Sequence, residues 1–124
     1  MTPDRLLAAI GGASALVAVA AGAFGAHALK TRLSPELLTV FETGARYQMY
    51  HAIAMVGAGL AFARWGTSQF LGAGWLFLAG TLLFSGSLYI VALTGARWWG
   101  AITPLGGVCF LAGWALFVWG AVAR

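Results

Sequence analysis

Charged side chains are scarce in this chain, and their scarcity excludes an ordinary water-soluble domain. Charged residues make up 8% of the sequence and hydrophobic residues 61%, whereas soluble globular proteins carry about 25% charged residues. The mean hydropathy is +0.89. Water could not hydrate the surface of such a chain, so we predict a protein of the lipid bilayer that has no soluble catalytic module.

Cysteine and histidine are also nearly absent, which limits metal and redox chemistry. The single cysteine, Cys109, allows no internal disulfide and no multi-thiolate metal site. A metal site between His27 and His51 is an alternative, but these two histidines lack a matching carboxylate or thiolate cluster. We therefore expect no metal, no other cofactor and no catalytic residue.

The basic residues do not indicate a nucleic-acid partner. Seven of them give a net charge of +4, yet they are scattered along the chain and flank its apolar segments. A nucleic-acid-binding surface needs them clustered on one face. Their positions are typical of anchors beside lipid headgroups, so we expect membrane lipids as partners.

Long apolar runs are what the chain has in abundance. They cover Leu6–Leu29, Tyr47–Ala63, Phe70–Thr94 and Pro104–Ala123. A helix needs about 20 residues to cross the hydrocarbon core, and each run has about that length. The sequence therefore predicts an all-α bundle of four transmembrane helices, in one domain over residues 1–124. The expected helices are approximately 6–29, 35–63, 70–94 and 104–123.

The second helix begins before its apolar run. Ser34 can cap it, Pro35 suits its first position, and Glu36 lies near the positive end of its dipole. Its first turns are amphipathic, so we predict an interfacial segment that leads into the membrane. In the same way, Thr103 and Pro104 are expected to cap and start the fourth helix.

The first run has features of a signal peptide, because Arg5 precedes an apolar stretch that contains small residues. It is longer than a typical signal core, so we interpret it as a retained transmembrane helix. Its many small residues also favour a place at the centre of the packing.

Small residues recur at helical spacing and predict close contacts between helices. The glycines assigned to such contacts are Gly22, Gly25, Gly80, Gly86, Gly106, Gly113 and Gly120. Ser85, Ser87 and Tyr89 are expected to form hydrogen bonds between helices, since no acid or base lies nearby in sequence to activate a serine.

A polar cluster at one end of the second apolar run is the candidate functional site. Its members are Glu42, Arg46, Tyr47, Tyr50 and His51, with His27 near the end of the first helix. Glu42 and Arg46 have the favourable spacing and order for a helical ion pair. One interpretation is a polar pocket in which His51 or Glu42 moves a proton and Arg46 holds an anionic group. The other is an interfacial helix that satisfies its own charges.

Four motifs resemble the DUF423 family of small integral membrane proteins. They are residues 22–29 (GAFGAHAL), 41–52 (FETGARYQMYHA), 84–89 (FSGSLY) and 102–107 (ITPLGG). The resemblance covers essentially the whole chain and implies a compact multi-span protein, located in the inner membrane in bacteria. The family has no established activity, so the resemblance carries over no catalytic residue.

These features favour an accessory or structural membrane protein rather than an enzyme. It would act by helix contacts with lipids, other membrane proteins or further copies of itself. Two alternatives remain open. One is a small transporter that depends on Glu42, and the other is a lipid- or quinone-binding protein that uses Glu42, Arg46 and His51.

Overall fold

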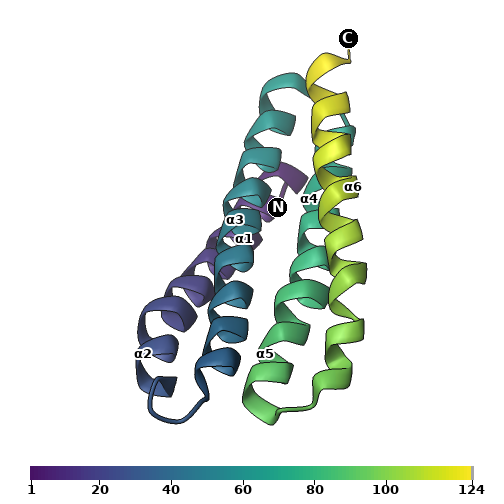
Figure 1. The fold of residues 1–124 in the computed structure, drawn as a ribbon. Helices are drawn as coiled ribbons and strands as arrows, with labels where there is room; N and C mark the ends of the chain where they lie inside the picture. The colour runs from purple at the N-terminus through teal and green to yellow at the C-terminus, as the bar shows by residue number, and fades with distance from the viewer. Residues whose placement is uncertain (124) are drawn as a thin grey trace.

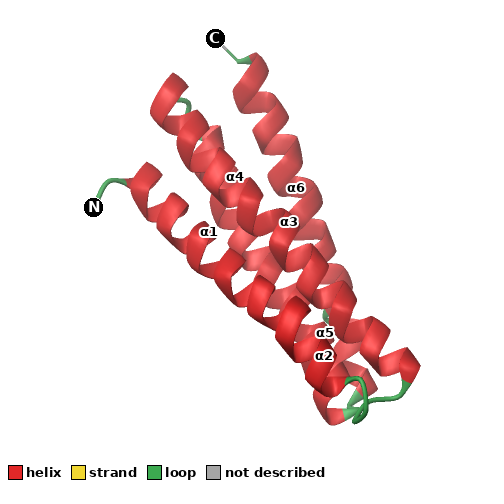
Figure 2. Ribbon diagram, turned by 90° about the vertical axis from the view of Figure 1, so that its left-hand side faces the viewer, coloured by secondary structure: helices red, strands yellow, loops and turns green. Residues whose placement is uncertain are grey.

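The computed structural model describes residues 1–123, and every regular element in that range is a helix. Four long helical rods run side by side (Figures 1 and 2). The first comprises α1 (Pro3–Val19), the π-helical turn η1 (Ala20–Gly25) and α2 (Ala26–Leu29), and the second is α3 (Pro35–Trp65). The third comprises α4 (Gln69–Gly80), the π-helical turn η2 (Thr81–Ser85) and α5 (Gly86–Thr94). The 3₁₀ turn η3 (Arg97–Ala101) and α6 (Thr103–Val122) form the fourth.

Local capping explains where α3 begins and ends. The backbone N–H of Leu37 donates to Ser34 Oγ at 3.2 Å, and Pro35 is the first helical residue, as predicted. The helix is terminated by Gly66, which follows Trp65 and has a φ of 68°, a left-handed conformation that glycine adopts at little cost. The predicted helix limits differ from the observed ones by at most three residues, at the first helix, which begins at Pro3 instead of Leu6.

The start of α6 differs from the expectation. Its N-cap is Ile102, and no side chain caps it. The hydroxyl of Thr103 lies 2.5 Å from that of Ser87 instead. Thr103 is therefore used to join α5 and α6, and the prediction that it caps the helix was wrong.

Three of the four rods are long and apolar enough to cross a membrane. They are Pro3–Leu29, Gln69–Thr94 and Arg97–Val122. The expected all-helical bundle is thus confirmed, with three candidate spans where the sequence predicted four. The α3 rod falls below the hydropathy of the others because Tyr47, Gln48, Tyr50 and His51 interrupt its apolar run.

The central rod is α3, which lies between the first rod and the α4–α5 rod, while α6 packs along α4 and η2 (Figure 1). The expectation that the first helix is central was wrong. In the most apolar window of each rod, 17% of residues are buried for Pro3–Leu29 and 39% for Gln69–Thr94. A Cβ on Gly11 of α1 would meet α3, whereas one on Gly12 would meet nothing within 4 Å, and Leu16 and Val17 are exposed.

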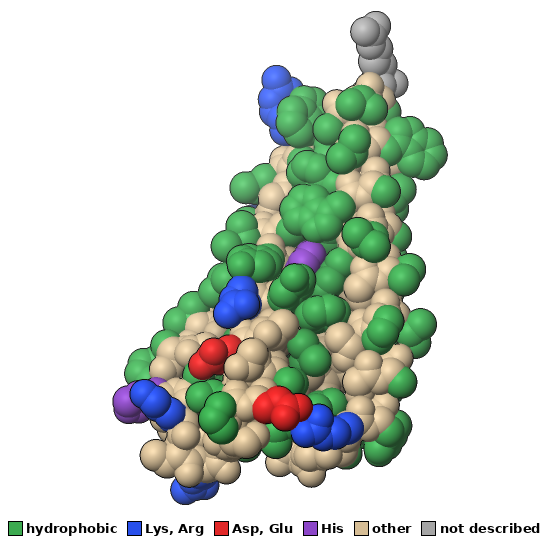
Figure 3. All heavy atoms as spheres, in the orientation of Figure 1, with side chains coloured by type: hydrophobic (Ala, Val, Ile, Leu, Met, Phe, Trp, Pro, Cys, Tyr) green, Lys and Arg blue, Asp and Glu red, His purple; other side chains and the backbone are tan. Residues whose placement is uncertain are grey.

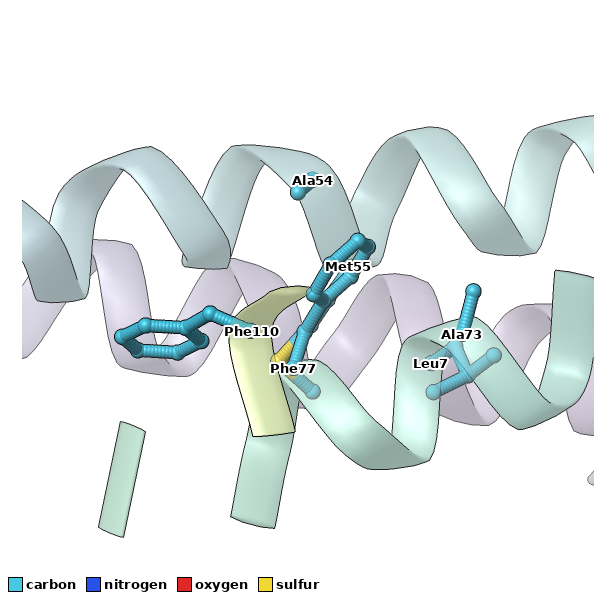
Figure 4. Packing of buried hydrophobic residues seen from close by; sticks show 6 residues of the cluster. All are labelled: Leu7, Ala54, Met55, Ala73, Phe77 and Phe110. Atoms are coloured by element: carbon cyan, nitrogen blue, oxygen red, sulfur yellow. The ribbon is translucent and has the colours of Figure 1, made fainter. Parts of the chain in front are cut away.

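The main core lies where α1, α3, α4 and α6 meet. Its buried members, drawn in Figure 4, are Leu7, Ala54, Met55, Ala73, Phe77 and Phe110. Close backbone approach permits this core. A Cβ on Gly11 would lie 2.7 Å from the Ala52 carbonyl oxygen, and one on Gly59 would lie 2.6 Å from that of Asp4. A side chain at either glycine would overlap the facing backbone. The two glycines therefore allow α1 to lie directly against α3.

Three of the glycines predicted to make helix contacts, Gly106, Gly113 and Gly120, are spaced seven residues apart on α6 and form a seam that faces the α4–α5 rod. Gly106 abuts the backbone of Phe84, a Cβ on Gly113 would lie 2.7 Å from Phe77, and one on Gly120 would lie 3.2 Å from Phe70. Opposite this seam, Gly80 abuts the ring of Phe110.

The other predicted packing glycines differ among themselves. A Cβ on Gly25 would lie 3.1 Å from the Phe41 ring, and one on Gly22 would make an ordinary contact of 3.8 Å with Ala45. A Cβ on Gly86 would meet nothing within 4 Å, so we correct the expectation there. Gly86 directly follows η2. A π-helical turn holds an extra residue and so rotates the following positions by about 100° out of the seam.

Candidate functional site

The structure divides the predicted polar cluster into two grooves, one on each side of α3. Glu42, Arg46 and Tyr50 line a groove between α1 and α3. Tyr47 and His51 line another, which α6 closes on its far side. The single Glu42–His51 pocket considered from the sequence is therefore not formed.

The α1–α3 groove has a volume of about 370 Å³ and an apolar floor. Ala18 and Ala45, on the two helices, are both buried there, and Gly22 and Met49 complete the lining. The side chains of Glu42 and Arg46 are exposed at the rim. They form no ion pair with each other, so the expected helical pair was wrong. Within residues 1–123 the only ion pair joins Arg97 Nη1 to Glu36 Oε1, at 2.8 Å.

The α3–α6 groove, of about 450 Å³, is aromatic, and Phe84, Phe110 and Trp114 line much of it. His51 is 5% exposed, and its ring stacks on that of Phe110 with centroids 3.5 Å apart. The Tyr47 carbonyl can only accept, so His51 Nδ1–H donates to it at 2.8 Å. The Trp114 indole can only donate, so its Nε1–H donates to His51 Nε2 at 3.1 Å. Both ring nitrogens are thus used within the protein.

The structure adds one residue that the sequence-based cluster did not include. Gln48 is buried, and its Nε2–H₂ donates to the carbonyl and the hydroxyl oxygen of Ser14 on α1, both at 3.2 Å. The Tyr89 hydroxyl on α5 donates to Gln48 Oε1 at 2.6 Å. Gln48 therefore joins three helices, which makes it the hub of the interior polar network.

The predicted interhelical hydrogen bonds from the third rod are confirmed. Ser85 Oγ donates to the Gly44 carbonyl at 2.7 Å, the hydroxyls of Ser87 and Thr103 share a hydrogen bond, and Tyr89 donates to Gln48. In the described part of the chain, no buried side-chain nitrogen or oxygen lacks a partner.

His27 lies apart from the other members of the cluster. It is exposed on α2, beyond η1, whereas His51 is buried in the middle of α3. The structure does not bring the two histidines together. Among residues 1–123, no group of three His, Cys, Asp or Glu side chains has the arrangement of a metal site.

Most charged side chains on the face shown in Figure 3 lie toward one end of the bundle, next to a mostly hydrophobic surface, and one basic side chain lies at the other end. At the end that carries most of these charges, the hydrogen bond and charge of Arg97 hold the pKa of Glu36 below its ordinary value. This contact links the start of α3 to η3, and both partners are about two-thirds exposed.

Apolar rods that are long enough to cross a bilayer, with polar groups turned inward or gathered at the ends, define a multi-pass helical membrane protein. The chain matches the family described as "Protein of unknown function (DUF423)" over residues 21–107. It therefore belongs to the DUF423 family, as its motifs indicated.

Bacterial relatives match almost the full chain. One is the UPF0382 membrane protein YwdK of Bacillus subtilis, 48% identical over 91% of this chain and 93% of the relative. Another is a UPF0382 membrane protein of Staphylococcus saprophyticus, 46% identical over 90% and 92%. The UPF0382 inner membrane protein YgdD of Escherichia coli is 41% identical over 96% and 91%. The predicted membrane location is thus confirmed. No solved structure matches.

Proposed function

We propose that this protein is a non-catalytic accessory protein that spans the membrane four times. It acts through contacts of its helices with lipids and with other membrane proteins. One observation carries the proposal. The buried polar groups of the described chain are used in hydrogen bonds within the bundle, several of which join one helix to another. An interior of this kind holds helices together and leaves the apolar outer surface as the region for contacts.

The placing of α3 as the fourth span rests on the direction of its polar side chains. Gln48 and His51 lower its hydropathy, but both are buried and would not meet lipid. Polar groups inside a membrane bundle are tolerated in this arrangement. Arg46 and Arg64 are about 27 Å apart along the helix axis at 1.5 Å per residue. This separation suits a hydrocarbon core of about 30 Å.

Reporter fusions test the four-span arrangement directly. A reporter that is active on only one side of the membrane would be fused after Arg32 and, in a second fusion, after Gly66. If α3 crosses the membrane, the two fusions report opposite sides. If both report the same side, α3 lies on the membrane and the proposal of four spans is wrong.

Photo-cross-linking and flux measurements test the accessory role against transport. Cross-linkers placed at the exposed positions Leu111 and Val118 of α6 should capture defined membrane proteins, or further copies of this chain, at one position and not at the other. Purified protein in proteoliposomes should produce no flux of protons or of a lipophilic cation above that of empty vesicles. A flux that Glu42→Gln abolishes would contradict the accessory role and establish the transporter.

A further inference from the structure

We propose that the α1–α3 groove binds the headgroup of a phospholipid that carries a primary amine, of the phosphatidylethanolamine type. In this site Arg46 holds the phosphate and Glu42 holds the ammonium group. The proposal rests on the four-span arrangement, because it requires Arg46 at the depth of the headgroups.

The size of the groove suits a lipid headgroup. Its volume of about 370 Å³ falls within the range of about 300–1,000 Å³ found for small-molecule sites. The floor consists of small side chains from both helices, with Ala18 and Ala45 buried and Gly22 beside them. Charge is confined to the rim, at Glu42 and Arg46. Met49 and Tyr50 lie about one turn beyond Arg46 toward the bilayer centre, where the first part of an acyl chain would follow the headgroup.

The two charges at the rim have no partner within the described chain. Glu42 and Arg46 are neighbours on one face of α3, yet neither is in an ion pair, whereas Glu36 on the same helix is paired with Arg97. Opposite charges that do not pair with each other can bind the two charges of a zwitterion. A guanidinium binds phosphate in a bidentate manner, and a carboxylate accepts hydrogen bonds from an ammonium group.

The order of the charges along α3 matches their order in the lipid. Arg46 is one turn, or about 6 Å, nearer to the bilayer centre than Glu42. In phosphatidylethanolamine the phosphate likewise lies nearer to the acyl chains, and the ammonium group is farther out. Tyr50 continues the lining toward the hydrocarbon, at a level where aromatic side chains are common.

The same chemistry distinguishes among lipids. Phosphatidylglycerol offers a phosphate but no cation for Glu42, and its negative charge is repelled by that carboxylate. Phosphatidylcholine has a quaternary ammonium group without N–H donors, so Glu42 can accept no hydrogen bond from it. We therefore expect phosphatidylethanolamine to bind more tightly than either of the other two lipids.

Native mass spectrometry from a mild detergent tests this order. Wild-type protein would be titrated with the three lipids, each with the same acyl chains. Wild type should prefer phosphatidylethanolamine by about tenfold, since one charge-assisted hydrogen bond has that magnitude. Glu42→Gln should lose the preference, and Arg46→Gln should weaken the binding of all three. Glu36→Gln removes the same charge from the same helix outside the groove and should behave as wild type.

A charge-reversed variant separates the order of the charges from their sum. Glu42→Arg combined with Arg46→Glu keeps the net charge and the composition, so it also serves as a control for folding and insertion. It should lose the preference for phosphatidylethanolamine. A wild type without this preference, or a reversed variant that keeps it, would overturn the proposal.

The two proposals fail separately. If the reporter fusions show opposite sides but lipid selectivity is absent, the lipid site is wrong and the four-span accessory protein stands. If the fusions show the same side, the fourth span is wrong, and the lipid site loses the depth on which it depends.

Discussion

Gln48 shows how much of this structure depends on single uncharged polar residues. It donates to Ser14 and accepts from Tyr89, so one side chain holds α3 to α1 and to α5. The sequence did not reveal it for two reasons. Gln48 is uncharged, whereas ionisable side chains are the ones that stand out in an apolar sequence, and its partners lie 34 and 41 positions away. Likewise, the sequence included His51 in the polar cluster but could not reveal its partner Trp114, which lies 63 positions away.

Replacing Gln48 should weaken the bundle measurably. Gln48→Met keeps the approximate volume but leaves the Tyr89 hydroxyl without its acceptor. We expect the free energy of unfolding to fall by about 1–2 kcal/mol, because interhelical hydrogen bonds in membranes have modest net values. Unfolding by sodium dodecyl sulfate in mixed micelles provides the measurement.

A double-mutant cycle with Tyr89→Phe identifies the contact responsible. The two changes remove the same hydrogen bond, so their combined effect should be smaller than the sum of the single effects. Tyr50→Phe is the matched control, because Tyr50 is exposed and its hydroxyl makes no hydrogen bond within residues 1–123. Strictly additive effects would show that Gln48 does not act through Tyr89.

The elements themselves follow from the sequence because their signals are local. The apolar runs and the Ser34–Pro35 start predicted the limits of the first three rods and of α6 to within three residues, but not the 3₁₀ turn η3 that precedes α6. The π-helical turns η1 and η2 have no comparable local signal, and they alter which residues share a face. For this reason Gly106, Gly113 and Gly120, spaced seven residues apart on the uninterrupted α6, all face the α4–α5 rod, whereas Gly86 lies beyond η2 and outside any seam.

Two alanine substitutions should separate seam glycines from others. Gly106→Ala places a methyl group against the backbone of Phe84, which cannot move as a flexible side chain could. We expect a loss of about 1–3 kcal/mol in the free energy of unfolding. Gly86→Ala meets open space and should leave stability unchanged or raise it by up to about 1 kcal/mol, because alanine favours the helix. Equal effects of the two changes would contradict the seam.

The whole molecule is a bundle of four rods in which α3 lies between the first rod and the α4–α5 rod, and the contact between Glu36 and Arg97 joins α3 to η3 at the charged end. Glu36 and Arg97 are 61 residues apart in sequence, so the sequence did not predict this contact. The position of the polar cluster on α3 was predictable, but its division between two grooves depends on how α1 and α6 flank that helix.

The tie between Glu36 and Arg97 should depend on pH. The folded state lowers the pKa of Glu36, so folding gains stability above the pKa of the unfolded chain and loses it as pH falls through the folded pKa. The difference in stability between wild type and Glu36→Gln should therefore be present at pH 7, begin to fall below the ordinary glutamate pKa of about 4.3, and vanish once the pH is below the lowered folded pKa. It should be small and should shrink in high salt, because both side chains are exposed. Unfolding measured across this range provides the test, and a difference that persists at low pH would contradict it.

The peripheral place of α1 has a consequence for how the protein is made. During synthesis α1 leaves the ribosome before α3, against which its close-fitting face packs. Until α3 arrives, Gly11 and Ser14 face lipid, and the amide that will bind Ser14 does not yet exist. Thus α1 is inserted into the membrane before α3, the helix against which it packs. In that interval the face of α1 that carries Gly11 and Ser14 is accessible to the helices of any neighbouring membrane protein.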